Sequence, residues 1–122
     1  MRNGDIIIAD AAEDNTVGKC SEIIGLKDNK VLSGLHTIPC RPTLIFATGY
    51  LGYYMNSNAY HNQLLPLIQG SKISSISKSA IQDTEISYPS SEDEQAQIGL
   101  IFIKLENLIT LHQRQFQKGE FI

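Results

Sequence analysis

The chain has 122 residues, a formal net charge of −3 and 42% hydrophobic side chains. This length suits one domain with a modest core, since chains of this size bury roughly two-thirds of the surface that they expose when unfolded. The hydrophobic content excludes a disordered chain, and the acidic balance excludes a protein that binds nucleic acid through its net charge alone.

Four short apolar runs in the first third of the chain predict the strands of a small mixed β-sheet, at residues 6–9, 20–24, 31–32 and 35–40. The β-branched residues of the first run suit a strand that is buried on both faces. The acidic and small residues 10–15 after this run predict a loop. Pro39 places the fourth run at an edge of the sheet or at a bulge, because proline donates no ladder hydrogen bond.

Residues 43–71 contain no Asp, Glu, Lys or Arg. Glycines, asparagines and a proline interrupt this stretch, so it lacks the ~20 mainly apolar residues that a membrane span needs. It predicts two short helices, at 44–55 and 58–67, with residues 56–58 as their turn and as the cap of the second helix, and with Pro66 near the end of that helix. Four tyrosines in these helices suit either stacking on bases or the core, and their helical spacing favours the core. They are Tyr50, Tyr53, Tyr54 and Tyr60.

A serine-rich loop follows, and it carries the groups that bind a phosphate backbone: hydroxyls, backbone N–H groups and lysines. It spans residues 70–79 and contains Lys72 and Lys78. Ser77 is placed to cap a short turn over residues 78–81, whose N–H groups would add a small anion site. The same composition also fits an ordinary solvated loop, and both interpretations stay open.

The last third of the chain predicts a strand at 84–88 and then a long amphipathic helix. Ser91 and Glu94 stand at the spacing of a capping box, which marks the first turn, and Gly119 offers a stop. Apolar positions recur at steps of three and four residues and form a seam along one side. The seam consists of Ile98, Ile101, Leu105, Leu108 and His112, widened by Phe102 and Ile109. It predicts contact with a partner, either the rest of the same domain or another helix.

The sequence contains no catalytic or metal-binding pattern. Its three histidines are far apart, and none has a companion at metal-ligand spacing. It also lacks a glycine-rich nucleotide-binding loop. Cys20 and Cys40 are expected to be reduced thiols, because nothing in the sequence resembles a signal peptide. We therefore expect no catalysis, no metal, no cofactor and a cytoplasmic location.

Nine segments, weak when taken singly, become specific through their order and spacing: GDIIIA at 4–9, VGK at 17–19, LHTIPCRP at 35–42, YYMNS at 53–57, GS at 70–71, ISKS at 76–79, EQ at 94–95, LENLI at 105–109 and HQR at 112–114. Over nearly its whole length the chain resembles the DNA specificity (S) subunit of type I restriction-modification systems. The stretch 70–114 is the most specific part of the resemblance.

The resemblance implies an α+β fold. Residues 1–90 would form an incomplete target recognition domain with a small mixed sheet and short helices, and residues 91–118 a conserved spacer helix of the coiled-coil type. In this family the recognition domain reads one half of a split DNA site, and the helices pair as a spacer. The subunit has no catalytic activity; it aims a methyltransferase (M) subunit and a restriction (R) subunit at the chosen sequence. A full subunit carries two domains and two helices, so the chain is expected to correspond to the C-terminal part of one.

The implied partners are double-stranded DNA, the M and R subunits, and a second copy or another S helix, with no membrane. Positive charge and hydrogen-bond donors in loops or at strand ends make five residues candidate DNA contacts: Lys19, Arg41, Lys72, Ser77 and Lys78. The alternative function is an assembly fragment that pairs through its helix with another S chain or with the methyltransferase and does not read DNA. The acidic balance favours this alternative, whereas the sheet, the tyrosines and the serine-lysine loop favour DNA recognition.

Overall fold

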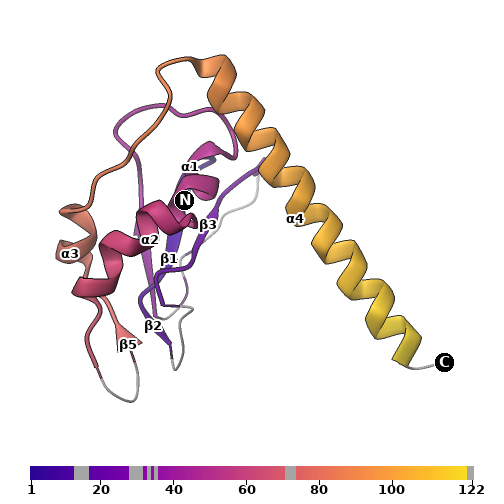
Figure 1. Ribbon diagram of the computed structural model, residues 1–122, viewed down its shortest axis with the longest axis horizontal. Coiled ribbons are helices and arrows are strands. Elements are labelled where there is room, and N and C mark those ends of the chain that lie inside the picture. Colours follow the sequence, from indigo (N-terminus) through magenta and orange to yellow (C-terminus); the bar gives the residue numbers. More distant parts are fainter. Residues whose placement is uncertain (13–16, 28–31, 33, 35, 71–73, 121–122) are drawn as a thin grey trace.

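The computed structural model describes residues 1–12, 17–27, 32, 34, 36–70 and 74–120, with the backbone alone at 12, 74 and 113–120. It shows an α+β fold, as expected: a small sheet domain with short helices, from which one long helix projects (Figure 1). Val31, Leu35 and Lys72 lie outside the described residues, so the start of two expected strands and one candidate DNA contact are not described. Leu32 is described and lies in no strand.

Strand β1 (Ile6–Ala9) is the middle strand of a three-stranded sheet. Strands β3 (Cys20–Glu22) and β4 (Thr37–Cys40) pair with its two edges. Both pairings are antiparallel, so the described sheet is not of the mixed type. Because β4 is an edge strand, Pro39 stands where proline is tolerated, as predicted.

The two faces of β1 are buried to different extents. Ile6 and Ile8 are 1% and 0% exposed, whereas Ile7 between them is half-buried. The strand is therefore fully covered on one face and partly covered on the other, where the sequence suggested burial on both. The largest fully buried side chains of the domain are Tyr60, Ile6, Ile8 and Leu64.

A second, two-stranded sheet follows the C-terminal end of β1. Strand β2 (Ala11–Ala12) pairs antiparallel with β5 (Ser74–Ser75). Part of the loop predicted at 10–15 is thus a strand, and residues 13–16 lie outside the described ones. The pairing joins segments that are distant in the sequence, which is why no local pattern marked either strand.

Helices α1 (Tyr50–Met55), α2 (Asn58–Leu64) and α3 (Lys78–Gln82) contribute buried side chains to the same core as the sheet. α1 begins later than predicted, since residues 44–49 are not helical. A 3₁₀ turn (η1, Leu65–Leu67) with a proline at its start ends the second helix. Serines cap α2 and α3, as their positions predicted.

Three of the four helical tyrosines belong to the core. Tyr50, Tyr54 and Tyr60 are buried, and the ring centroids of Tyr54 and Tyr60 are 5.8 Å apart. Tyr53 is 40% exposed, and its ring lies edge-on to that of Phe102 in the long helix. The core interpretation is therefore right for three of the rings, and Tyr53 lies at the contact between the domain and the helix.

Residues 84–88 are not the strand that the sequence predicts. Side chains take the place of a neighbouring strand along this segment. Gln63 donates through Nε2 to the carbonyl of Glu85 and accepts from its N–H through Oε1, both at 2.9 Å. The Tyr50 hydroxyl donates to the Ser87 carbonyl at 2.6 Å. The backbone groups of Glu85 and the carbonyl of Ser87 are thus bound by side chains and not by a ladder.

Helix α4 (Glu92–Glu120) is 29 residues long and begins at the predicted cap. The Glu94 N–H donates to Ser91 Oγ at 3.4 Å, and acidic residues occupy the first turn, where the helix dipole favours them. The helix continues past Gly119, where the sequence suggested a stop. Its first turns lie against α1, and the remainder extends away from the domain (Figure 1).

Candidate nucleic-acid interface and helix joint

The candidate DNA contacts divide between the two ends of β1. Lys19 precedes β3, and its carbonyl accepts a hydrogen bond of 3.0 Å from the N–H of the last residue of β1. Ser77 and Lys78 follow Ile76, whose N–H donates to the carbonyl of Asp10 at 2.9 Å. Both segments therefore lie beside the C-terminal end of β1, next to the β2–β5 sheet.

The serine and the two lysines at this end differ in what their side chains do. Ser77 Oγ accepts from the Ala80 N–H at 3.1 Å, so its hydroxyl holds the first turn of α3. Lys19 and Lys78 are exposed, and among the described residues neither ammonium group has an ion-pair partner. The lysines are thus available to an anion, whereas the serine primarily shapes the backbone beside them.

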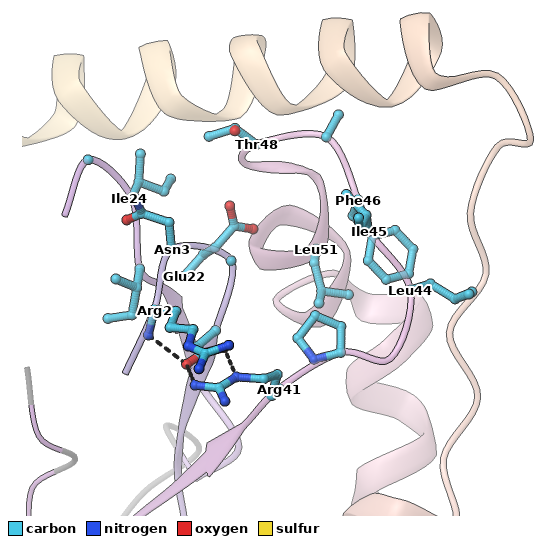
Figure 2. Close-up of a pocket in the computed structure, with 16 residues that line it drawn as sticks. Arg2, Asn3, Glu22, Ile24, Arg41, Leu44, Ile45, Phe46, Thr48 and Leu51 are labelled. Atoms are coloured by element: carbon cyan, nitrogen blue, oxygen red, sulfur yellow. Dashed lines mark hydrogen bonds and ion pairs between the residues drawn. The ribbon is translucent and has the colours of Figure 1, made fainter. Parts of the chain in front are cut away.

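Arg41 lies at the opposite end of β1, where it is paired with Asp5. Its Nε and Nη2 atoms donate to Asp5 Oδ1 and Oδ2, both at 2.9 Å, and the Arg2 N–H donates to Oδ2 at 2.8 Å (Figure 2). Asp5 is 3% exposed. The hydrogen bonding from Arg41 is the largest influence on its carboxyl group; with the Arg2 N–H it outweighs burial and lowers the pKa of Asp5 to about 2. Arg41 thus has a structural task that the sequence did not reveal.

A pocket of about 310 Å³ opens beside this ion pair. Arg2 and Arg41 lie on one side of it, and Leu44, Ile45 and Phe46 lie on the other (Figure 2). A second pocket, of about 410 Å³, shares Arg41, Leu44 and Phe46 with the first. The mixture of guanidinium groups with the exposed Leu44 and Ile45 and the half-buried Phe46 fits a protein contact surface better than a phosphate site.

α4 joins the domain through a backbone contact with the start of α1. A Cβ atom added to Gly99 would lie only 2.9 Å from Tyr50 N and closer still to the carbonyl oxygen of Thr48. A Cβ added to Gly49 would lie 2.7 Å from the Gly99 carbonyl oxygen. Gly49 also has a φ of +87°, a conformation that favours glycine. Neither position has room for a side chain.

Gln95, one turn before Gly99, is 4% exposed and forms the second part of the joint. Its Oε1 accepts from the Ala47 N–H at 3.1 Å, and its Nε2 donates to the Pro89 carbonyl at 2.8 Å. One amide side chain therefore binds the segment before α1 and the segment before α4. Neither Gln95 nor Gly99 was predicted to take part in such a joint, although a glycine inside a long helical pattern is a signal of close packing.

Glu22 of β3 holds the other side of α1. Its carboxylate accepts from the Gly49 N–H at 2.6 Å and from the Gly52 N–H at 2.9 Å. These N–H groups belong to the first turn of α1, which has no side-chain cap of its own. The sheet, α1 and α4 are thus connected through one short stretch of backbone around Gly49.

The predicted seam of α4 divides into a covered and an uncovered part. Ile98 and Phe102 are half-buried and contact the domain, through the core and through Tyr53 respectively. The other four apolar members of the seam are more than half exposed: Ile101 (60%), Leu105 (53%), Leu108 (62%) and Ile109 (53%). His112 is also exposed. At 3.6 residues per turn, the centre of the exposed group lies roughly 135° around the helix from Gly99. Two different faces of α4 therefore serve the joint and the seam.

In the part of the chain that the structure describes, no group of three or more His, Cys, Asp or Glu side chains is arranged to hold a metal ion. Among the same residues, no helix combines the length and the apolar character that crossing a bilayer requires. Cys20 and Cys40 are free thiols. Burial raises the pKa of Cys20 to about 12 and also raises that of Cys40.

The chain matches a protein-family model described as the type I restriction modification DNA specificity domain, over residues 2–118. The matched region contains the sheet domain, the short helices and nearly all of α4. No significant match was found among curated proteins or among solved structures.

Proposed function

Because the chain belongs to the family of type I restriction modification DNA specificity domains, we propose that it is a DNA recognition subunit that directs a methyltransferase and a restriction endonuclease to a chosen sequence. The observation that carries the proposal is the extent of the family match, which runs through the sheet domain and along α4. These are the two parts that such a role needs: a domain that contacts DNA and an arm that contacts partners. Catalysis belongs to the partner subunits.

The proposed DNA surface is the C-terminal end of β1, where Lys19 and Lys78 lie on neighbouring segments with exposed side chains. An ammonium group that neutralises a phosphate releases a counterion, so such contacts make binding depend on salt. Ser77 supports this surface by capping α3. Lys72, outside the described residues, belongs to the same serine-rich loop and stays a candidate. Arg41 is given a structural role and not a DNA contact, because its guanidinium group is bound to the buried carboxylate of Asp5.

Salt-dependent DNA binding by the complex with the methyltransferase tests this surface. We expect Lys19→Ala and Lys78→Ala each to lower the slope of log affinity against log salt by about one, whatever the DNA sequence. Lys27→Ala is the matched control: it removes the same charge, but from an exposed position next to Leu26, which is bound to Asn3 near the opposite end of β1. If the Lys78→Ala and Lys27→Ala complexes gave the same slope of log affinity against log salt, Lys78 would not be a DNA contact.

A second candidate function is favoured by the exposed seam of α4: assembly with another specificity chain, a second copy included, or with the methyltransferase, without reading DNA. Four large apolar side chains that are more than half exposed follow one another along this face. A helix with such a stripe gains stability by burying it against a partner helix. The two candidate functions differ in one property, since only the first gives a complex with sequence preference.

The seam is tested by the double substitution Ile101→Asp plus Leu108→Asp. Both positions are exposed, so the domain should remain folded while self-association or methyltransferase binding is lost. Ala96→Asp plus Asn107→Asp is the control, because it adds two charges at exposed positions of the same helix away from the seam. The seam would not be a partner surface if sedimentation showed the unsubstituted chain to be monomeric at high concentration and the chain also failed to bind the methyltransferase.

A further inference from the structure

α4 touches the domain over a short length and then extends away from it. Gln95 and Gly99 are buried, Ile103 is half-buried, and every described side chain from Lys104 to His112 is exposed. At a rise of 1.5 Å per residue, the contact between residues 95 and 103 covers about 12 Å of a helix about 43 Å long. The direction of the whole helix therefore depends on a small joint near its start.

Successive turns of α4 contribute to this joint in different ways. Gln95 fixes the first contact through its two hydrogen bonds, and Gly99 places backbone against backbone. One turn later, Ile103 Cδ1 would lie 2.9 Å from a Cβ atom on Gly49. Gln95, Gly99 and Ile103 are four residues apart, so they lie on one face of the helix. Three successive turns of this face therefore contact the domain. Close backbone packing leaves no room for the helix to rotate or slide without a clash.

We propose that Gly49, Gly99 and Gln95 are positioning residues, which set the direction of α4 relative to the recognition domain and thereby the spacing between two DNA half-sites that a paired assembly accepts. The proposal rests on the proposed function, because it takes α4 as the arm that joins two recognition domains. When two DNA-binding domains are held in a fixed relation, their separation dictates the spacing of the half-sites that they bind.

The geometry gives the size of the effect. A methyl group at Gly99 would force the two backbones apart on the order of 1 Å. Gln95 lies about 6 Å from Gly99 along the axis, so a helix still held there would tilt by about 10°. At the far end of α4 this tilt amounts to a displacement of about 6 Å, whereas successive base pairs rise by about 3.4 Å. One added methyl group is thus enough to change the preferred spacing by a base pair or more.

Spin-label distances in the full chain test the direction of α4. Labels at Asn62→Cys in α2 and Asn107→Cys in α4 occupy exposed positions. The native thiols, Cys20 buried and Cys40 half-buried, have raised pKa values and should react slowly with the label. We expect Gly99→Ala to shift the mean distance by about 3 Å. Gln95→Leu keeps the size of the side chain but removes both hydrogen bonds, and should broaden the distribution even if Gly99→Ala fails to fold. Gly34→Ala, where an added Cβ meets nothing within 4 Å, should leave the distance unchanged. Distances equal to those of the unsubstituted chain in both variants would overturn the proposal.

Selection from random DNA by the complex with the methyltransferase tests the spacing. The unsubstituted complex and the Gly34→Ala control should select the same half-sites at the same spacing. A folded Gly99→Ala or Gln95→Leu complex should select the same half-sites at a different or relaxed spacing, a change that mere loss of stability would not produce. Unchanged spacing together with retained selectivity would refute the positioning role alone. Failure of the unsubstituted complex to select any sequence would refute the proposed function and the spacing role with it.

Discussion

Removal of the Glu22 carboxylate should destabilise the protein, because this group caps α1 from the neighbouring sheet. It receives hydrogen bonds of 2.6 Å and 2.9 Å from the N–H groups of Gly49 and Gly52. Hydrogen bonds to a charged group contribute about 1.5–3 kcal/mol each. Glu22 is only half-buried, so water replaces part of this contribution after truncation. We expect Glu22→Ala to lower the free energy of unfolding by about 2–3 kcal/mol and Tm by about 10 °C.

Urea unfolding followed by circular dichroism measures this loss. Glu22→Gln should cost about half as much as Glu22→Ala, because the amide keeps the size and one acceptor oxygen but loses the charge. Glu106→Ala, at an exposed position of α4, is the control and should stay within about 0.5 kcal/mol of the unsubstituted chain. If Glu22→Ala were as stable as this control, the capping role of Glu22 would be refuted.

Two further predictions concern titrating groups. The Asp5 carboxyl has a pKa of about 2 in the folded chain against an ordinary 3.8, so its contribution to stability is complete above pH 3.8 and is lost as the pH falls towards 2. Arg41→Gln removes the main cause of the lowered pKa and should move acid unfolding to higher pH, as followed by circular dichroism; an unchanged acid midpoint would contradict the pairing. The raised pKa of Cys20, about 12, and the raised pKa of Cys40 predict that both thiols are protonated at pH 8 and react slowly with iodoacetamide until urea is added. Rapid alkylation of the folded chain would show that these thiols are accessible.

The features that the sequence predicted well are those governed by neighbouring residues. The β-branched run of β1 forms the central strand, and Ser57, Ser77 and Ser91 each accept a backbone N–H at the start of a helix. Capping depends on a side chain and a backbone group three residues apart, so it is visible in the sequence. The three- and four-residue spacing of apolar residues likewise predicted the long helix α4.

The features that the sequence did not reveal depend on contacts between distant segments. Residues 84–88 have the composition of a strand, but their backbone is bound by Gln63 and Tyr50 instead of by another strand. α1 begins at Tyr50 because Glu22, far back in the chain, caps its first turn. Polar residues such as Gln95 are ordinarily taken as surface positions, and only the fold shows that its amide is buried and binds both the Ala47 N–H and the Pro89 carbonyl.

The candidate site was predictable only in part, because some of its features depend on contacts between distant segments. Exposed lysines in loops are evident from the sequence, and Lys19 and Lys78 are exposed in the structure. Whether a basic residue is committed to another group is not evident, because the partner of Arg41 depends on the pairing of β1 with β4. In that pairing Ile6 stands opposite Cys40, which brings the preceding Asp5 beside the following Arg41.

The most direct test of the proposed function is DNA binding by the complex of this chain with its methyltransferase, measured for selected and scrambled sequences across a salt series. A recognition subunit predicts tighter binding to the selected sequence at every salt concentration, with a steep slope that Lys78→Ala reduces by about one. A stable complex that binds both sequences equally would contradict DNA recognition and leave assembly through α4 as the function of the chain.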